Sequence, residues 1–275
     1  MKSENGTARA ILSGIPKEEQ SAISSFLVRE TSPGTNRELK ELARAGAADG
    51  TVLLAYAQTE GRGRMGRTFY SPADTGIYIS FLFRPKHSLS DVLLYTPSAA
   101  VWTAEAIEHV FGKDCAIKWV NDVFVGGKKV AGILTEAETA GDGSLSYLIL
   151  GIGVNLTPPK DGFPQELAGI AGAIEEAGAD PRREAFCAEL CRRVFAGVRR
   201  LPEAPPLAAY RSRCRFLSRP ITVSRVGTDG MKAGEETRLA VGIDDRFRLI
   251  TRDGTGREEV HESGEIRIVP EAAGE

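Results

Sequence analysis

The sequence predicts an α+β (mixed α/β) domain at residues 23–216, followed by a small all-β domain at residues 217–270. Two observations lead to this division. Up to about residue 216, strand-like apolar runs occur among segments whose apolar residues recur at helical spacing. Beyond Arg219, short β-like runs alternate with Gly and Asp turns. Residues 1–22 are polar and fall short of the roughly 50 residues that a domain needs, so we interpret them as a short N-terminal extension.

The first elements of the α/β part are a helix and two strands. Thr35–Ala45 is predicted to be a helix because a Thr/Asn cap opens it and Glu38 follows three positions after Thr35, as in a capping box. The apolar runs Thr51–Ala57 and Ile77–Arg84 are typical of strands.

A long helix and a hairpin come next. Asp91–Phe111 carries apolar residues at helical spacing, which indicates core packing. Ala116–Val125 and Lys128–Glu138 flank Gly126-Gly127, a strong signal for a two-residue hairpin turn. Tyr147–Leu156 is an apolar run broken by two glycines, so we expect a buried strand whose backbone something else approaches closely.

The last part of the α/β domain is predicted to be helical. Asp180-Pro181 is expected to open a helix that continues to about Arg200, with the aspartate as cap and the proline in the first turn. Three prolines then precede a short helix near Leu207–Cys214. The β-like runs of the second domain are Ile221–Val223, Arg238–Val241, Phe247–Thr251, Glu258–His261 and Ile266–Val269.

Composition excludes several classes of protein. The formal net charge of −2 gives no basic character of the kind that nucleic-acid binding needs. There is no apolar run of the roughly 18 residues that indicate a membrane span, and the first residues lack the pattern of a signal peptide, so we expect a cytoplasmic protein. The spacing of the cysteines argues against a zinc site and favours thiols buried in a reduced core. These cysteines are Cys115, Cys187, Cys191 and Cys214.

The most informative motif is Gln58–Arg67, in which Arg62, Arg64 and Arg67 alternate with glycines directly after a predicted strand. Arginine offers a planar, charged fork that suits phosphate or carboxylate. Glycine lets the backbone approach a ligand closely. The motif therefore indicates an anion-binding loop, although a bare surface loop remains the alternative from these residues alone.

Three further segments raise the specificity of this motif: Lys118–Asp122 (Lys-Trp-Val-Asn-Asp), Lys129–Leu134 and Gly151–Leu156. In this order and spacing, with Thr35-Asn36 upstream, the chain resembles the biotin–protein ligase (biotin–acetyl-CoA-carboxylase ligase) family. Gly242–Asp244 and Gly264–Ile266 extend the resemblance, which covers about Ser25 to Val269.

The chain departs from that family at two positions. Gly34 stands where the family usually has serine, which removes one hydroxyl near the ligand. Val120 stands where the family usually has proline, which loosens a backbone constraint.

The resemblance implies a reaction in two steps. Biotin's carboxylate attacks the α-phosphate of ATP to give biotinyl-adenylate, and a lysine of a biotin carboxyl carrier protein then accepts the biotinyl group. The catalytic residues implied are Lys118, Arg64 and Lys129, because fixed cations neutralise the two anions that must meet. The implied biotin-binding residues are Gly34, Thr35, Asn36, Gln58, Gly61, Arg62, Gly63, Arg64, Lys118, Trp119, Gly132 and Gly153.

The resemblance also implies a nucleotide site and its metal. The implied ATP-binding residues are Arg64, Arg67, Lys118, Asn121, Lys129 and Asn155. Asp122, beside Asn121, is the candidate that orients the Mg²⁺ of MgATP, and a turn or cap role for the pair is the alternative. Phe69 and Tyr78 are candidates to pack on adenine or on the Arg-Gly loop, with core packing as the alternative for each. No tightly bound prosthetic group is expected.

The family relationship carries further expectations. The all-β domain is expected to be an SH3-like barrel, and the chain is expected to be a form without an N-terminal DNA-binding domain. A homodimer is left open. Two alternative functions also stay open: a lipoate-type protein ligase, which shares the fold and the adenylate chemistry, and a non-catalytic protein that senses biotin.

Overall fold

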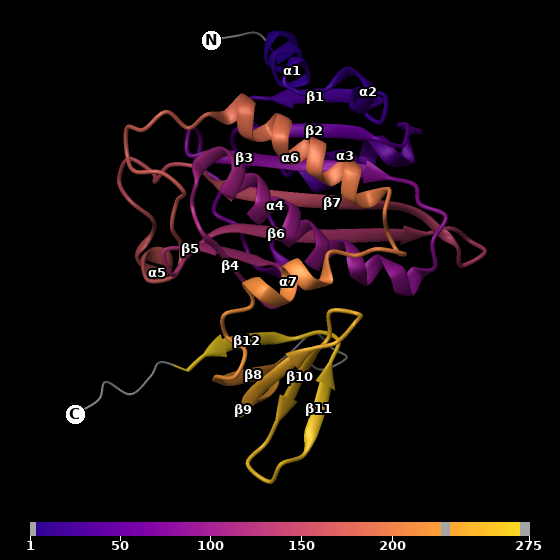
Figure 1. Cartoon of the computed structure of the whole chain (residues 1–275). Coiled ribbons are helices and arrows are strands. Elements are labelled where there is room, and N and C mark those ends of the chain that lie inside the picture. The colour runs from indigo at the N-terminus through magenta and orange to yellow at the C-terminus, as the bar shows by residue number, and fades with distance from the viewer. Residues whose placement is uncertain (1–3, 227–231, 270–275) are drawn as a thin grey trace.

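The computed structural model describes residues 4–226 and 232–269, which form two sheets with helices around the larger one (Figure 1). The larger sheet contains β1 (Ser25–Arg29), β2 (Thr51–Ala55), β3 (Gly76–Phe83), β4 (Cys115–Lys118), β5 (Asp122–Val125), β6 (Lys128–Thr139) and β7 (Leu145–Asn155). The smaller sheet contains β8 (Pro220–Val226), β9 (Lys232–Ile243), β10 (Leu249–Arg252), β11 (Glu258–His261) and β12 (Glu265–Ile268). The α-helices are α1 (Glu4–Ser13), α2 (Lys17–Gln20), α3 (Thr35–Arg44), α4 (Tyr95–Phe111), α5 (Gln165–Ala168), α6 (Arg183–Val198) and α7 (Leu207–Arg213).

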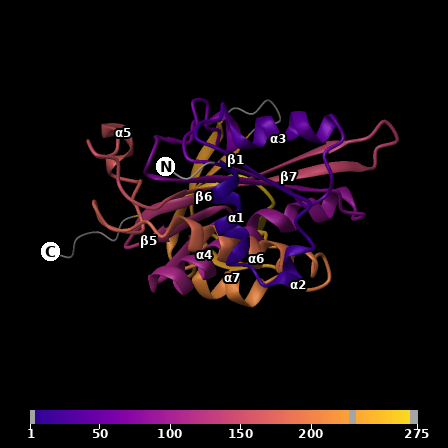
Figure 2. The ribbon, with the colours of Figure 1, turned by 90° about the horizontal axis from the view of Figure 1, so that it is seen from above.

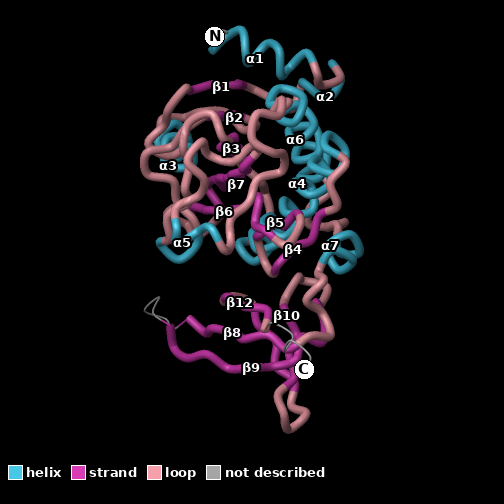
Figure 3. Tube along the Cα trace, turned by 90° about the vertical axis from the view of Figure 1, so that its left-hand side faces the viewer, coloured by secondary structure: helices cyan, strands magenta, loops and turns pink. Residues whose placement is uncertain are grey.

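The larger sheet has the strand order β1-β2-β3-β7-β6-β5-β4. Strands β1 and β2 are parallel and the other neighbours are antiparallel. Helices α4 and α6 cover one face, and α3 lies on the other (Figure 3). The sheet is therefore the middle layer of the α/β part, as the mixed pattern of helices and strands predicts.

Alternation along β2 shows how the sequence produces these layers. Val52 and Leu54 belong to the main core on the α4 and α6 side, whereas Leu53 packs with Leu39 and Ala43 of α3. Side chains of successive strand residues point to opposite faces, so a continuous apolar run gives a strand that is buried on both sides. All five residues of β2 are buried.

The hairpin predicted at Gly126-Gly127 is confirmed. Val125 of β5 pairs with Lys128 of β6, and both glycines have positive φ, 56° and 77°. A two-residue turn with two positive φ values is the I′ type that suits twisted strands. The predicted strand before it divides into β4 and β5, which are joined by residues 119–121.

The predicted start of α3 at Thr35 is confirmed, but its predicted cap and the predicted start of α6 are wrong. Helix α3 has Gly34 at its N-cap with no side-chain cap, and the Glu38 carboxylate instead accepts bonds from Arg29 and Ser32, each at 2.9 Å. Helix α6 begins at Arg183, because Arg182 takes a left-handed conformation with φ 44°. The second error arises because residues 180–182 precede the helix, where the Arg182 N–H donates to Asp180 Oδ1 at 3.0 Å, instead of forming its first turn.

The predicted helix at Asp91–Phe111 begins as a 3₁₀ segment, η2 (Leu89–Leu94), and continues as α4. Helix α6 approaches α4 closely, since a Cβ on Gly197 would lie 2.1 Å from Trp102 Cε2. Near them, residues 4–20 form α1 and α2 beside β1, and Ile11 and Ile15 are buried in the main core (Figure 2).

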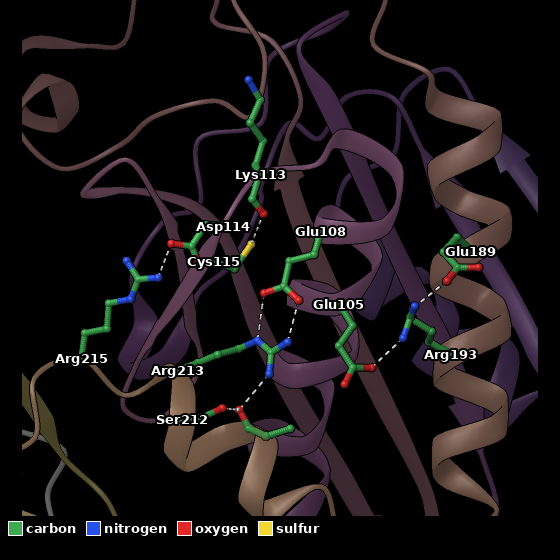
Figure 4. A network of polar contacts seen from close by, with 11 residues as sticks. Glu105, Glu108, Lys113, Asp114, Cys115, Glu189, Arg193, Ser212, Arg213 and Arg215 are labelled. Atoms are coloured by element: carbon green, nitrogen blue, oxygen red, sulfur yellow. Dashed lines mark hydrogen bonds and ion pairs between the residues drawn. The ribbon is translucent and has the colours of Figure 1, made fainter.

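A network of ion pairs joins α4, α6 and α7 on the helical face away from α3 (Figure 4). Arg213 of α7 forms a bidentate ion pair with Glu108 of α4, with N···O distances of 2.6 and 3.0 Å. Arg193 of α6 contacts Glu105 at 2.7 Å and Glu189 at 2.6 Å. These contacts hold together the helices that pack on the face of the larger sheet opposite α3.

The smaller sheet is antiparallel, with the strand order β11-β10-β9-β8-β12. Strands β11 and β12 stand at its two edges, so the strand pairing among the described residues does not close a barrel. Pro270, the last residue of the predicted domain, lies outside the described residues.

The smaller sheet is fixed to the α/β part by Trp119, whose indole N–H donates to Phe247 O at 2.9 Å. The Tyr210 ring packs edge-on against Phe247 at 5.0 Å between centroids.

In the described parts of the chain, there is no helix with the length and apolar character needed to cross a membrane. All four cysteines are buried and free, as predicted.

Candidate functional site

A cavity of about 690 Å³ opens on the α3 side of the larger sheet. Its walls come from α3, the Arg-Gly loop (residues 58–67), β6, β7, the segment before α6, and β12 of the smaller sheet. The predicted site residues that line it are Gly34, Thr35, Asn36, Gln58, Arg62, Gly63, Arg64, Arg67, Lys118, Trp119, Asn121, Asp122, Lys129, Gly132, Gly153 and Asn155. Gly61 is the predicted site residue that does not line the cavity.

Glycines on β6 and β7 shape the floor of the cavity. A Cβ on Gly151 would lie 2.1 Å from Asn36 Oδ1, and a Cβ on Gly153 would lie 2.8 Å from Phe69 Cε1. Gly132 pairs with Gly153 in register, and its Cβ would lie 3.1 Å from Phe69 Cε2. The close approach predicted for β7 is therefore real, and the groups that approach are the Asn36 amide and the half-buried Phe69 ring.

Thr35 and Gln58 meet in the wall of the cavity. The Thr35 N–H donates to Gln58 Oε1 at 2.9 Å, and the Gln58 amide donates to Ser71 Oγ at 3.0 Å. The hydroxyl of buried Ser80 lies 2.8 Å from Thr35 Oγ1. This polar group combines donors and acceptors, which is what a cyclic urea requires from its site. Ser71 and Ser80 were not predicted, because neither belongs to a motif.

Gly61 does not line the cavity because it packs against the segment that contains Phe69 and Ser71. A Cβ there would lie 2.4 Å from Phe69 O and 2.6 Å from Ser71 Oγ. Gly61 thus lets the Arg-Gly loop pack against the segment that follows it. Gly34, by contrast, has room for a side chain, since the nearest atom to an added Cβ is Glu60 O at 3.5 Å.

Asn36 is held by contacts that the sequence did not predict. Its amide donates to Glu136 Oε2 at 2.8 Å and to Leu134 O at 3.2 Å, and its Oδ1 lies 2.6 Å from Ser80 Oγ. Glu136 also pairs with Lys40 of α3. The start of α3 is therefore fixed to β6 across 100 positions of sequence, a separation at which no local pattern gives a signal.

The Arg-Gly loop contains a short 3₁₀ turn, Arg64–Gly66, in which Met65 and Gly66 have φ values of 57° and 72°. The Arg64 guanidinium donates to Asn121 Oδ1 at 3.1 Å and to Gly264 O at 3.5 Å. Burial lowers the pKa of Arg64, while the carboxylates of Asp122 and Glu265 act in the opposite direction. Arginine stays charged under such a shift, so the loop presents a partly dehydrated cation to the cavity.

Two lysines add to this positive charge. Lys118, at the end of β4, is half-buried, and burial lowers the pKa of its ammonium group. The Asp122 carboxylate raises that pKa, and Lys129 lowers it further. Lys129 Nζ lies 2.6 Å from Asp122 Oδ1 and 6.0 Å from the centre of the Phe69 ring. Around Arg64, Arg67, Lys118 and Lys129, the carboxylates of Asp122 and Glu265 are outnumbered by cations, which favours an anionic ligand.

Three other predicted site residues have structural partners. Trp119 is 2% exposed, and its N–H is bound to Phe247 O, so it joins the two sheets while also bordering the cavity. Asn121 Nδ2 donates to Ile133 O at 3.0 Å. Asn155 Nδ2 donates to Gly172 O at 3.0 Å. A turn role for Asn121, which the sequence left open, is thus present beside its contact with Arg64.

The segment between β7 and α6 supplies apolar lining that was not predicted. Phe163, Leu167 and Ile170 border the cavity, and Ile170 is 56% exposed. Backbone bonds join Lys129 N–H to Ile170 O at 2.8 Å and Gly172 N–H to Lys129 O at 2.9 Å. Within the described residues, no group of three or more His, Cys, Asp or Glu side chains is arranged to hold a metal ion.

Comparisons with known proteins agree with this geometry. Residues 27–155 match the model of the Biotin/lipoate A/B protein ligase family. Over 155 residues the chain is 38% identical to the bifunctional ligase/repressor BirA of Bacillus subtilis, a match that covers 56% of this chain. The chain spans about half of that relative's length, 47%.

Other relatives match over most of their length. The biotin--[acetyl-CoA-carboxylase] ligase of Mycobacterium tuberculosis is 31% identical over 238 residues, which is 84% of each chain. That of Paracoccus denitrificans is 32% identical over 241 residues, which is 82% of this chain and 92% of the relative. A solved structure of the biotin protein ligase from Aquifex aeolicus, in complex with biotin and ATP, has a TM-score of 0.71 at 25% identity and covers 90% of this chain and 100% of that one.

The fold, the cavity and the two relatives matched over more than four fifths of their length all lead to the same assignment. This chain belongs to the biotin–protein ligase family.

Proposed function

We propose that this chain is an ATP-dependent biotin–protein ligase, which forms biotinyl-5′-adenylate and transfers the biotinyl group to a lysine of a biotin carboxyl carrier protein. One observation carries the proposal: Arg64, Arg67, Lys118 and Lys129 line a single cavity that also contains the Thr35–Gln58 polar group. Such a site can accept a neutral ring at one end and negative charge at the other.

In the first step, a carboxylate must approach a phosphate. Fixed cations lower the barrier because they hold the charge that develops in the transition state without reorganising. Lys118 stands between the two anions in this scheme and forms the contact common to both. Arg64 and Lys129 bind the phosphate oxygens, and Thr35 with Gln58 orients the ureido ring of biotin.

Magnesium enters as part of the MgATP substrate. Asp122 fits the oxygen ligands that Mg²⁺ prefers, and a single carboxylate is enough where phosphates and waters complete the shell. Asp122 contacts Lys129 Nζ at 2.6 Å here, and it would supply one oxygen ligand to the ion of MgATP while Lys129 would bind the phosphates. The half-buried Phe69 ring helps to exclude water from the cavity.

In the second step, the amine of the carrier lysine attacks the acyl carbon of the adenylate. An amide bond forms, the bond from acyl carbon to phosphate oxygen breaks, and AMP leaves with the electron pair. The amine loses one proton in this step. A mixed anhydride hydrolyses readily, so the enclosure that the Arg-Gly loop gives to the cavity protects the intermediate.

Some further expectations belong to this proposal. The net charge of −2 supports a ligase that does not bind DNA. Four buried, free cysteines support a reducing cytoplasmic location. The C-terminal sheet is proposed to be the SH3-like domain of the family, and a homodimer stays a prediction.

The proposal is tested by two measurements on the purified chain. Pyrophosphate release should require both biotin and MgATP, and mass spectrometry should show one biotinyl group on a single lysine of an apo carrier domain. Lipoate in place of biotin should give neither signal. Activity with lipoate alone would favour the lipoate-type alternative, and biotin binding without pyrophosphate release would favour a non-catalytic sensor.

The Lys118→Ala variant tests the role of the central cation. We expect it to lose about 10²-fold or more in the rate of adenylate formation, because removing one preorganised contact of this kind typically costs that much. Circular dichroism should show an unchanged fold, since Lys118 is half-buried at the end of an edge strand. A variant that releases pyrophosphate at the wild-type rate would rule out this role.

A further inference from the structure

Strand β12 stands at an edge of the smaller sheet, and β8 is its partner there in the described chain. Just after this strand, the Val269 N–H donates to Pro220 O at 3.2 Å, so the backbone of Val269 points to β8. Backbone groups of alternate residues share a direction in an antiparallel pair. The N–H and C=O groups of Ile266 and Ile268 therefore point away from β8, to the open edge.

That open edge lies along the catalytic cavity. Five consecutive residues, Gly264 to Ile268, line the cavity. Successive side chains of a strand point to opposite faces, so a cavity on one face of the sheet would be lined by every second residue. Five consecutive lining residues therefore indicate that the cavity runs along the edge of the strand. The open backbone groups of β12 thus form part of the cavity wall.

The start of β12 lies beside the arginines proposed to hold the phosphates. Gly264 O is 3.5 Å from Arg64 Nη2, and the Glu265 carboxylate pairs with Arg67. At about 3.3 Å per residue, the strand extends roughly 10 Å from that point. Its far end at Ile268 has a side chain that is 39% exposed.

An uncovered edge strand is a template for pairing with another extended chain. If the proposed function holds, the second substrate is a protein, and its acceptor lysine must reach the acyl carbon near Lys118 and Arg64. An extended segment placed along β12 would end at this point. We propose that the edge of β12 binds the lysine-bearing segment of the carrier protein as an added strand, through the backbone groups of Ile266 and Ile268.

The test uses two variants of the full chain at the same position. Ile268→Pro removes an N–H that points to the open edge and leaves the bonds to β8 in place. Ile268→Ala removes the side chain and keeps the N–H. We expect Ile268→Pro to raise KM for an apo carrier domain about tenfold above Ile268→Ala, since one lost hydrogen bond leaves its partner unpaired. Pyrophosphate release without carrier should be equal in the two variants, because both lack the isoleucine side chain at the cavity wall.

A second measurement uses the wild-type chain and needs no variant to fold. Amide hydrogen exchange, with biotin, a non-hydrolysable ATP analogue and the carrier domain present, should slow at Ile266 and Ile268 when the carrier binds. Equal KM values in the two variants, unchanged exchange at these amides, or slowing that follows self-association of the ligase would each overturn the edge of β12 as the carrier site. A wild-type chain that forms no adenylate would overturn the proposed function itself.

Discussion

The ionisation of Lys118 follows from the place where β4 ends. Burial lowers the pKa of its ammonium group below the ordinary value of 10.5, so the group loses its proton at a lower pH than a solvated lysine does. If the protonated form neutralises the two anions, adenylate formation must decline as pH rises through this lowered pKa. We expect the alkaline limb of the pH–rate profile to fall below pH 10.5.

The Lys118→Arg variant serves as the comparison. Arginine keeps its charge throughout this range, so the variant should lack the alkaline limb even if its maximal rate is lower. A limb that is unchanged in Lys118→Arg would assign the titration to another group. The measurement is single-turnover pyrophosphate release between pH 6 and about pH 10 in both proteins. This range covers the expected decline in the wild type, because the pKa of Lys118 lies below its ordinary value.

Gly151 gives a second prediction about a single residue. An added Cβ would meet Asn36 Oδ1 at 2.1 Å, and Asn36 is itself held by Glu136 and Ser80. We expect Gly151→Ala to destabilise the chain by about 1–3 kcal/mol, as other overpacking substitutions do, and to weaken biotin binding. Gly141→Ala is the control, because nothing lies within 4 Å of its added Cβ. Urea denaturation and calorimetric titration with biotin would measure both effects, and equal stability in the two variants would contradict the prediction.

These residues also show what the sequence could and could not predict about the site. The glycines of β7 indicated that another group approaches the backbone, and the motifs named the residues that border the cavity. The sequence could not name Asn36 and Phe69 as the approaching groups, because they lie far from β7 in the chain. Ser80 and Glu136 gave no signal, since a lone polar residue in an apolar strand looks the same with or without a distant partner.

The Arg-Gly loop is the element that we propose to be the lid of the cavity, which it lines with Arg62, Arg64 and Arg67. Its charge is held near the cavity by the bonds of Arg64 to Asn121 and Gly264 and by the pairing of Arg67 with Glu265. A loop with three glycines has a large ordering entropy, about 1–2 kcal/mol per residue. Charge-assisted bonds must offset that cost when the loop closes on an anion.

We therefore expect Arg64→Gly to form adenylate but to release it early, so that lysines of bystander proteins become labelled. The test is a chase of preformed, radiolabelled complex with unlabelled biotin, beside a blot for biotin on an added bystander protein. Arg64→Lys should give an intermediate rate, since it keeps the charge and loses the fork. Wild-type retention in Arg64→Gly would mean that the loop does not act as the lid.

Among whole elements, those with a local cause were predicted well. Gly126-Gly127 determines the β5–β6 hairpin within four residues, and the apolar runs determine β2, β3 and β7. The start of α6 was predicted wrongly because Asp180-Pro181 has the composition of a helix start, while Arg182 has a left-handed conformation that sequence composition does not reveal. The capping box at α3 was wrong because Glu38 has stronger partners in Arg29 and Ser32.

At the level of the whole molecule, the smaller sheet is joined to the α/β part at separate points. Trp119 reaches Phe247, Arg246 donates to Ser90 O at 3.1 Å, and Arg211 donates to Ile243 O at 2.8 Å. The sequence predicted both parts, yet it gave no indication of these contacts. Trp119 and Phe247 are 128 positions apart, and the pairing depends on the folded positions of both sheets.

Trp119→Phe tests whether this residue joins the sheets or serves as a wall for biotin. Phenylalanine keeps an aromatic face but leaves Phe247 O without its donor, which typically costs about 1–3 kcal/mol. We expect the free energy of unfolding to fall by this amount while the affinity for biotin stays within about twofold, since less than about 0.4 kcal/mol of contact is lost. Denaturant titration and calorimetry would show it. A large loss of biotin affinity at unchanged stability would favour the wall.

The contacts of the Arg-Gly loop also set an order of events during synthesis of the chain. Arg64 and Arg67 leave the ribosome 200 and 198 positions before their partners Gly264 and Glu265. At about 5–20 residues per second, the loop waits roughly 10–40 s for them. A nascent chain that has already folded its larger sheet thus lacks the contacts that restrain the loop. Under the proposed function, retention of a reactive acyl-adenylate is therefore among the last properties that the growing polypeptide acquires.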